Sequence, residues 1–226
     1  ADTTETSGNP FSMTRDINFA GSGEMDNGMT ISYFQLLSAG AFSSSGLTLD
    51  MGDAGSMTFM NGTSGGHGIA AYEDKMPNAA EQVWDDLDGQ ANGVVTFNSA
   101  NTFGYGTSFA GVNVSANYNK QTDGGSAKSF AADFAPMDNA MIFVAMSDEY
   151  AGSNATTDQV TLGGTYTAGA ITAGIQRSNI DVSTVNGDAD RTHIAASFQV
   201  NEDLAVAYGM STVEFEDASL TDQEDS

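Results

Sequence analysis

The sequence predicts an all-β fold, an antiparallel sheet that closes into a transmembrane β-barrel, and three observations predict it. Apolar and polar residues alternate along stretches of about ten residues, tight turns rich in Gly, Asn and Asp join the stretches in pairs, and longer polar connections join the pairs. About 9–11 tilted residues cross a bilayer as a strand, and only a closed sheet leaves no unpaired backbone in lipid. No apolar run reaches the roughly 18 residues that a spanning helix needs, which excludes a helical membrane protein.

Twelve strands are expected in a single domain covering residues 1–226. Alternation is clearest in the second half of the chain, where Val112 and Val114 take one face and Asn113 and Ser115 take the other. The apolar face should point outward and be exposed, at Val112, Val114, Leu162, Ile194, Phe198, Leu204 and Val206. The expected ranges are 12–21, 28–38, 46–52, 55–61, 93–109, 111–120, 127–136, 140–149, 157–167, 170–179, 190–200 and 203–213.

Short and long connections alternate along the chain. Short turns are expected at Met25–Gly28, Gly52–Gly55, Ala110–Gly111, Met137–Asn139, Ala168–Gly169 and Asn201–Asp203, which places all of them on one edge of the sheet. In outer-membrane barrels the short turns are periplasmic and the long loops are extracellular. Both ends of the chain are therefore expected on the extracellular side.

One connection, at residues 62–92, is much longer than the others. Pro77 suits a first helical turn, Gly89 suits a helix C-terminus, and Ala80, Val83, Trp84 and Leu87 recur at helical spacing. The pattern predicts a short amphipathic helix inside the loop, with Trp84 as its anchor. The loop either folds inward or lies on the rim as an extracellular lid.

The charge balance is strongly acidic, with six Lys and Arg against thirty Asp and Glu and a net charge of −24. Such a surface repels nucleic acid, which excludes that class of partner. Carboxylates concentrated in loops either keep the surface solvated or create a negative field at a pore entrance. The chain has no cysteine, which excludes disulfides and thiolate chemistry.

No pattern in the sequence indicates catalysis. The only two histidines, His67 and His193, have no neighbouring nucleophile in sequence. Neighbouring carboxylates such as Asp85 and Asp86 are common on protein surfaces and do not by themselves indicate a site. The sequence contains no calcium-binding repeat. We therefore expect a protein that is not an enzyme and has no cofactor, with calcium binding by the loop carboxylates left open.

Two runs of residues carry a resemblance to a known family. The chain contains "GLTLDMGDAGSMTFMNG", then a long acidic loop, then "GVVTFNSANTFGYGTSFAGVNVSANYN". In this arrangement the chain resembles general bacterial porins of the alphaproteobacterial, Rhodobacter-like type. The resemblance implies a trimer of barrels of about sixteen strands, in which the third extracellular loop folds into the lumen and forms the constriction.

The resemblance places the constriction at residues 72–88. Its implied acidic side consists of Glu73, Asp74, Glu81, Asp85, Asp86 and Asp88. Strand parity places Arg191 on the polar face with His193, so it is the candidate for the facing wall. Basic residues are fewer than such a wall usually carries, and no final aromatic-ended strand is visible. With both ends extracellular, one strand before Ala1 and three after Ser226 would complete the barrel.

The sequence thus predicts an outer-membrane porin for passive diffusion of small hydrophilic solutes and ions, with a preference for cations. Its expected location is the bacterial outer membrane, as a homotrimer in contact with lipid and lipopolysaccharide. Lys128 and Arg177 lie on the outward parity, where they could reach lipopolysaccharide phosphates. The alternative is a secreted acidic all-β adhesin or surface-layer protein that binds calcium.

Overall fold

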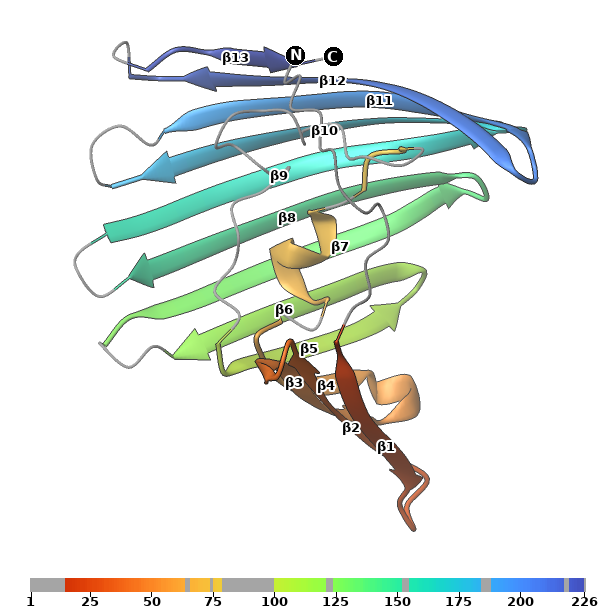
Figure 1. The fold of residues 1–226 in the computed structure, drawn as a ribbon, viewed down its shortest axis with the longest axis vertical. Helices are drawn as coiled ribbons and strands as arrows, with labels where there is room; N and C mark the ends of the chain where they lie inside the picture. The colour runs from red at the N-terminus through yellow and green to blue at the C-terminus, as the bar shows by residue number, and fades with distance from the viewer. Residues whose placement is uncertain are drawn as a thin grey trace.

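The structure is a computed structural model and describes residues 15–63, 66–73, 75–78, 100–120, 124–151, 155–183, 188–217 and 220–225. Its strands form one antiparallel sheet in sequence order, from β1 to β13 (Figure 1). They are β1 (Ile17–Glu24), β2 (Thr30–Ser38), β3 (Ala41–Asp50), β4 (Ser56–Asn61), β5 (Thr102–Phe109), β6 (Val112–Lys120), β7 (Ser126–Met137), β8 (Ala140–Ala151), β9 (Ala155–Ala168), β10 (Ile171–Val182), β11 (Ala189–Asn201), β12 (Leu204–Phe215) and β13 (Gln223–Asp225). Two 3-10 helices, η1 (Gly52–Ala54) and η2 (Gly68–Tyr72), interrupt the series.

The sheet has two free edges within the described residues. β1 pairs with β2 and β13 pairs with β12, and no pairing joins β1 to β13. The antiparallel all-β architecture is confirmed, whereas closure into a barrel stays a prediction. No helix in the described ranges is long and apolar enough to span a bilayer.

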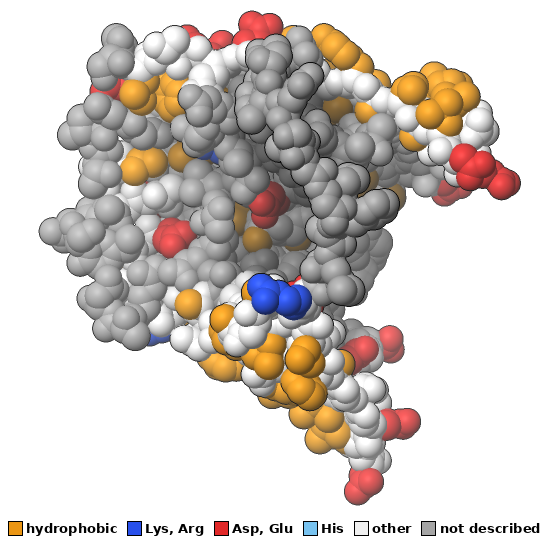
Figure 2. All heavy atoms as spheres, viewed as in Figure 1, with side chains coloured by type: hydrophobic (Ala, Val, Ile, Leu, Met, Phe, Trp, Pro, Cys, Tyr) orange, Lys and Arg blue, Asp and Glu red, His pale blue; other side chains and the backbone are white. Residues whose placement is uncertain are grey.

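The two edges of the sheet differ in their connections, as the sequence predicted. The tight-turn edge carries the connections β1–β2, β3–β4, β5–β6, β7–β8, β9–β10 and β11–β12, and the long-loop edge carries the rest. Acidic side chains mark the tips of the β1–β2 and β11–β12 hairpins in Figure 2, and hydrophobic side chains cover the strands behind them. Alternation of strand direction alone fixes this division, because each hairpin returns the chain to the opposite edge.

One connection on the long-loop edge is shorter than predicted. The strand expected at 46–52 begins at Ala41, and a two-residue turn joins it to β2. Ala39 (φ 52°) and Gly40 (φ 87°) both have positive φ, the conformation of the turns that suit two-residue hairpins. Asn-Gly or Asp-Gly is the usual sequence of such a turn. Because alanine stands in the first position here, the sequence did not predict the turn.

Other strand boundaries also differ from the predicted ones, and one strand was missed. β1 ends at Glu24 and not at residue 21, and β5 begins at Thr102, while residues 93–99 of the expected strand lie outside the described residues. β13 pairs with β12 from Gln223↔Val213 to Asp225↔Ser211. Three polar residues carry no alternation, so the pattern could not reveal this strand.

The strands present two faces of opposite character. The inner face, which η2 covers, carries Asn117, Ser129, Thr161, Gln176 and His193, all buried. The outer face carries exposed large hydrophobic residues, including all seven that the sequence predicted to point outward, from Val112 at 37% to Leu162 at 58% exposure. All described strands belong to one sheet, so no second sheet covers these side chains. A β-sandwich would bury them, and the structure does not favour the adhesin alternative on that ground.

Candidate pore lining and constriction

The inner face carries many polar side chains, together with an apolar patch on which the loop packs. Its hydroxyl and amide groups bond across neighbouring strands, as in the 2.8 Å hydrogen bond from Ser178 Oγ to Thr161 Oγ1. His193 Nδ1 lies 2.8 Å from Ser211 Oγ, and both residues have 0% exposure, so the pair is closed to a substrate. A wall of hydroxyls and amides suits contact with water and polar solutes.

The loop after β4 folds back onto this inner face. η2 lies against β6, β7 and β8, in front of these strands in Figure 1. Ile69, Tyr72 and Met76 are buried there. They pack with small or flat side chains of the wall, namely Ala127, Ala131, Phe143 and Ala145. The rings of Tyr72 and Phe143 stack with their centroids 4.8 Å apart.

Hydrogen bonds to the loop backbone fix the position of the docked segment. Asn117 Nδ2 donates to His67 O at 2.6 Å, Gly68 N donates to Ser115 Oγ at 2.9 Å, and Ile69 N donates to Ser129 Oγ at 3.3 Å. The three wall side chains in these bonds belong to two neighbouring strands, Ser115 and Asn117 to β6 and Ser129 to β7. Buried backbone N–H and C=O groups need hydrogen-bond partners, and the small polar side chains of the wall supply them to the loop.

Glycines in β5 make room for the imidazole of His67. A Cβ added to Gly104 would lie 2.5 Å from His67 Cδ2, and one added to Gly106 would lie 2.9 Å from His67 Nδ1. Neither distance is tolerated between real atoms, so only glycine permits this approach. Burial also lowers the pKa of His67, which favours the neutral ring.

Tyr72 links the loop to two separate strands. Its hydroxyl donates to Asp133 Oδ2 at 2.5 Å, and its carbonyl oxygen accepts from Gln176 Nε2 at 3.2 Å. Burial, reinforced by the hydrogen bond and the negative charge of Asp133, raises the pKa of the hydroxyl, which therefore remains a donor at neutral pH. Asp133 lies in β7 and Gln176 in β10, so Tyr72 holds the segment across a wide part of the wall.

The predicted constriction residues are only partly placed. Arg191 lies on the inner face with His193, as parity predicted, and is buried. Glu73 follows η2 and is half-buried. Asp74, Glu81, Trp84, Asp85, Asp86 and Asp88 lie outside the described residues, as does most of the helix expected near Met76–Leu87. Lys75–Asn78 is not helical. The constriction role of these residues, and calcium binding by them, stay predictions.

A cavity of about 380 Å³ opens on the inner face beside the docked segment. It lies toward the tight-turn edge, between η2 and strands β4 to β8. Its lining residues are Ser56, Gly66, His67, Ala71, Tyr72, Lys75, Gly106, Thr107, Asn113, Val114, Ser115, Asp133 and Met141. The sequence offers only weak signals for two of these residues: Lys75 is the only Lys or Arg between residues 62 and 92, and Asp133 falls on the polar parity of its strand.

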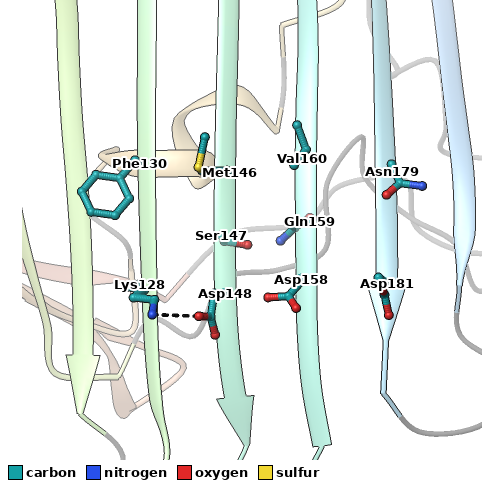
Figure 3. Close-up of a pocket in the computed structure, with 10 residues that line it drawn as sticks. All are labelled: Lys128, Phe130, Met146, Ser147, Asp148, Asp158, Gln159, Val160, Asn179 and Asp181. Atoms are coloured by element: carbon teal, nitrogen blue, oxygen red, sulfur yellow. Dashed lines mark ion pairs between the residues drawn. The ribbon is translucent and has the colours of Figure 1, made fainter.

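The outer face has a row of charged side chains at the long-loop edge, next to its apolar surface (Figure 3). Figure 3 shows Lys128, Asp148, Asp158 and Asp181 in one row, with Phe130, Met146 and Val160 in the next. These residues surround a shallow cavity of about 440 Å³. Lys128 Nζ lies 2.8 Å from Asp148 Oδ2, and Arg177 Nη2 lies 3.1 Å from Asp190 Oδ2. The two outward cations predicted to reach lipopolysaccharide are therefore paired with carboxylates of neighbouring strands.

Comparison with known proteins identifies the architecture. No family model matches the chain, and no curated protein matches it in sequence. OmpT of Vibrio cholerae, an outer membrane protein, matches in a trimer form (TM-score 0.64, 11% identity, 93% of this chain and 72% of that chain). The outer-membrane expressed OmpT matches with a TM-score of 0.68 and 12% identity, over 92% of this chain and 70% of that chain. The chain has the fold of outer-membrane β-barrel proteins.

A triple mutant of Rhodopseudomonas blastica porin is also similar, with 18% identity over 88% of this chain and 83% of that chain. The TM-score of this match is 0.47. Identities of this size show the fold alone. The resemblance to one particular type of porin therefore stays a prediction.

Proposed function

We propose that the chain forms an outer-membrane channel for passive diffusion of small hydrophilic solutes and ions. The observation that carries the proposal is the opposition of the two faces, because apolar side chains cover the outer face while a polar inner face holds a docked loop segment. A lipid-facing outside and a wet inside are what a membrane channel needs. The bacterial outer membrane is the location that fits this fold.

The docked segment supports a narrowing of the channel. η2 and the residues that follow it occupy space on the inner face that a rim loop would leave open. The proposed constriction uses Glu73, Asp74, Glu81, Asp85, Asp86 and Asp88, with Arg191 on the wall. The excess of carboxylates, within a net charge of −24, favours cations over anions.

Reconstitution into planar bilayers tests the channel directly. We expect stepwise conductance and a reversal potential that favours cations at low salt. Neutralising Glu81, Asp85, Asp86 and Asp88 together should lower the cation preference, and salt near 1 M should mute the difference because the Debye length falls to about 3 Å. Absence of conductance from correctly folded protein would contradict the proposal.

Removal of the loop tests the constriction. Deleting residues 77–88 should raise single-channel conductance and admit larger sugars in liposome-swelling assays, since less of the cross-section is blocked. An unchanged sugar cut-off would leave a channel without this constriction. The structural likeness to a trimer form of OmpT supports a homotrimer, which native gels and sedimentation of the detergent-solubilised protein would test.

A further inference from the structure

We propose that the inner-face cavity beside η2 binds a small zwitterionic solute of the free amino-acid class. The inference rests on the proposed channel, whose inner face would bring solutes to this place. The cavity, of about 380 Å³, is within the range of ligand sites and larger than a small amino acid, so water shares the space. Two opposite charges, one on the loop and one on the wall, line it.

The positive group is Lys75, which follows η2. Its Nζ lies 5.7 Å from the centroid of the Tyr72 ring, so a cation–π contact positions the ammonium at the cavity wall. The side chain is half-buried, and no ion pair joins it to a carboxylate of the described residues. An ammonium in this position can pair with the carboxylate of a solute.

The negative group is Asp133 of β7. Its Oδ2 accepts the hydrogen bond from the Tyr72 hydroxyl, and its Oδ1 accepts from Asn113 Nδ2 at 2.8 Å. The two donors fix the plane of the carboxylate, whose oxygens have further lone pairs for a solute ammonium. Tyr72 contacts both charged groups and therefore sets where they lie relative to each other.

The pattern of charge favours a zwitterion over other small solutes. Within the described residues Lys75 and Asp133 do not form an ion pair with each other, so neither charge neutralises the other. A cation or an anion alone would satisfy one group and meet a like charge at the other, while a neutral sugar would satisfy neither. Ser56, Thr107 and Ser115 supply hydroxyls for the remaining polar contacts.

The test measures binding of glycine to the whole, detergent-solubilised protein by saturation-transfer NMR. Glycine should bind with an affinity at least tenfold higher than that of acetate, ethylamine or glycerol. Lys75→Gln and Asp133→Asn should each weaken glycine binding about tenfold or more, which corresponds to about 1.4 kcal/mol. Lys120→Gln serves as the control, because Lys120 donates to Gly124 O away from the cavity and should leave binding unchanged.

Equal binding of all four solutes, or unchanged glycine binding in Lys75→Gln, would overturn the inference. Heat-modifiability on a gel checks that each variant is folded. If Asp133→Asn does not fold, Lys75→Gln and the solute series decide between the outcomes. Binding in detergent is independent of conductance, so a protein that conducts without binding glycine refutes the site alone, and one that binds without conducting refutes the channel alone.

Discussion

The inner and outer faces of the same strands are specified in different ways. On the outer face, side chains such as Leu162 and Ile175 are more than half exposed, so they need only be apolar. On the inner face, single atoms matter, as where His67 lies against Gly104. The surroundings of the outer face therefore require only apolar residues there. On the inner face, the docked segment restricts which residue can stand at individual positions.

The largest expected effect comes from placing a charge on the apolar part of the outer face. Val144→Arg should destabilise the protein in lipid by about 2–4 kcal/mol, because an arginine in the middle of a strand and beside Ala132 and Leu162 loses hydration in lipid. Asn179→Arg, beside the charged row of the same face, should cost only about 0–1 kcal/mol. Folding into lipid vesicles, followed by heat-modifiability, measures both, and equal costs would contradict the assignment of this face to lipid.

A substitution on the inner face should have a smaller but specific effect. Gly104→Ala places a Cβ within 2.5 Å of both His67 Cδ2 and Thr58 Oγ1, so the loop must move. Overpacking of this kind costs about 1–3 kcal/mol. Channel conductance should rise as the segment leaves the wall. Gly21→Ala, which meets nothing within 4 Å, is the matched control, and the same conductance in both would refute the docking.

Acid should weaken the docking of the loop segment on the inner face, because His67 becomes protonated. Burial lowers the pKa of His67, so the docked state is favoured by the neutral ring and retains its full stability above the ordinary histidine pKa of about 6.5. That contribution is lost as the pH falls below this value toward the lowered pKa. As the segment leaves the wall, the conductance of the wild type should therefore rise between pH 7.5 and pH 5. His67→Gln removes the titration, and an unaltered pH profile in this variant would exclude His67 as its source.

The smallest effect is expected at the ion pair of Arg177 and Asp190 on the outer face. Arg177 and Asp190 are partly exposed, and a double-mutant cycle with Arg177→Met and Asp190→Asn should give a coupling of about 0–1 kcal/mol. Unfolding in urea at low and at high salt measures it. A coupling well above this range would mean that this ion pair is shielded from water.

Sequence alternation predicted the two faces because a strand has a period of two, and this holds at each of the seven outward residues. It placed Arg191 on the inner face for the same reason. It failed where local chemistry carries no signal, as at the turn of Ala39 and Gly40 and in the three-residue β13. It also did not show that Lys75 and Asp133 line the same cavity, since only the folding back of the loop brings them to it.

Besides its buried side chains, the backbone of the docked segment is itself bound by the wall. His67 O, Gly68 N, Ile69 N and Tyr72 O all bond to side chains of the wall. Backbone atoms are the same in every amino acid, so evolution can replace many side chains of such a loop without detaching it. A lineage could therefore alter which solutes pass while it keeps the scaffold, and divergence should be faster in the loop than in Ser115, Asn117, Ser129 and Gln176.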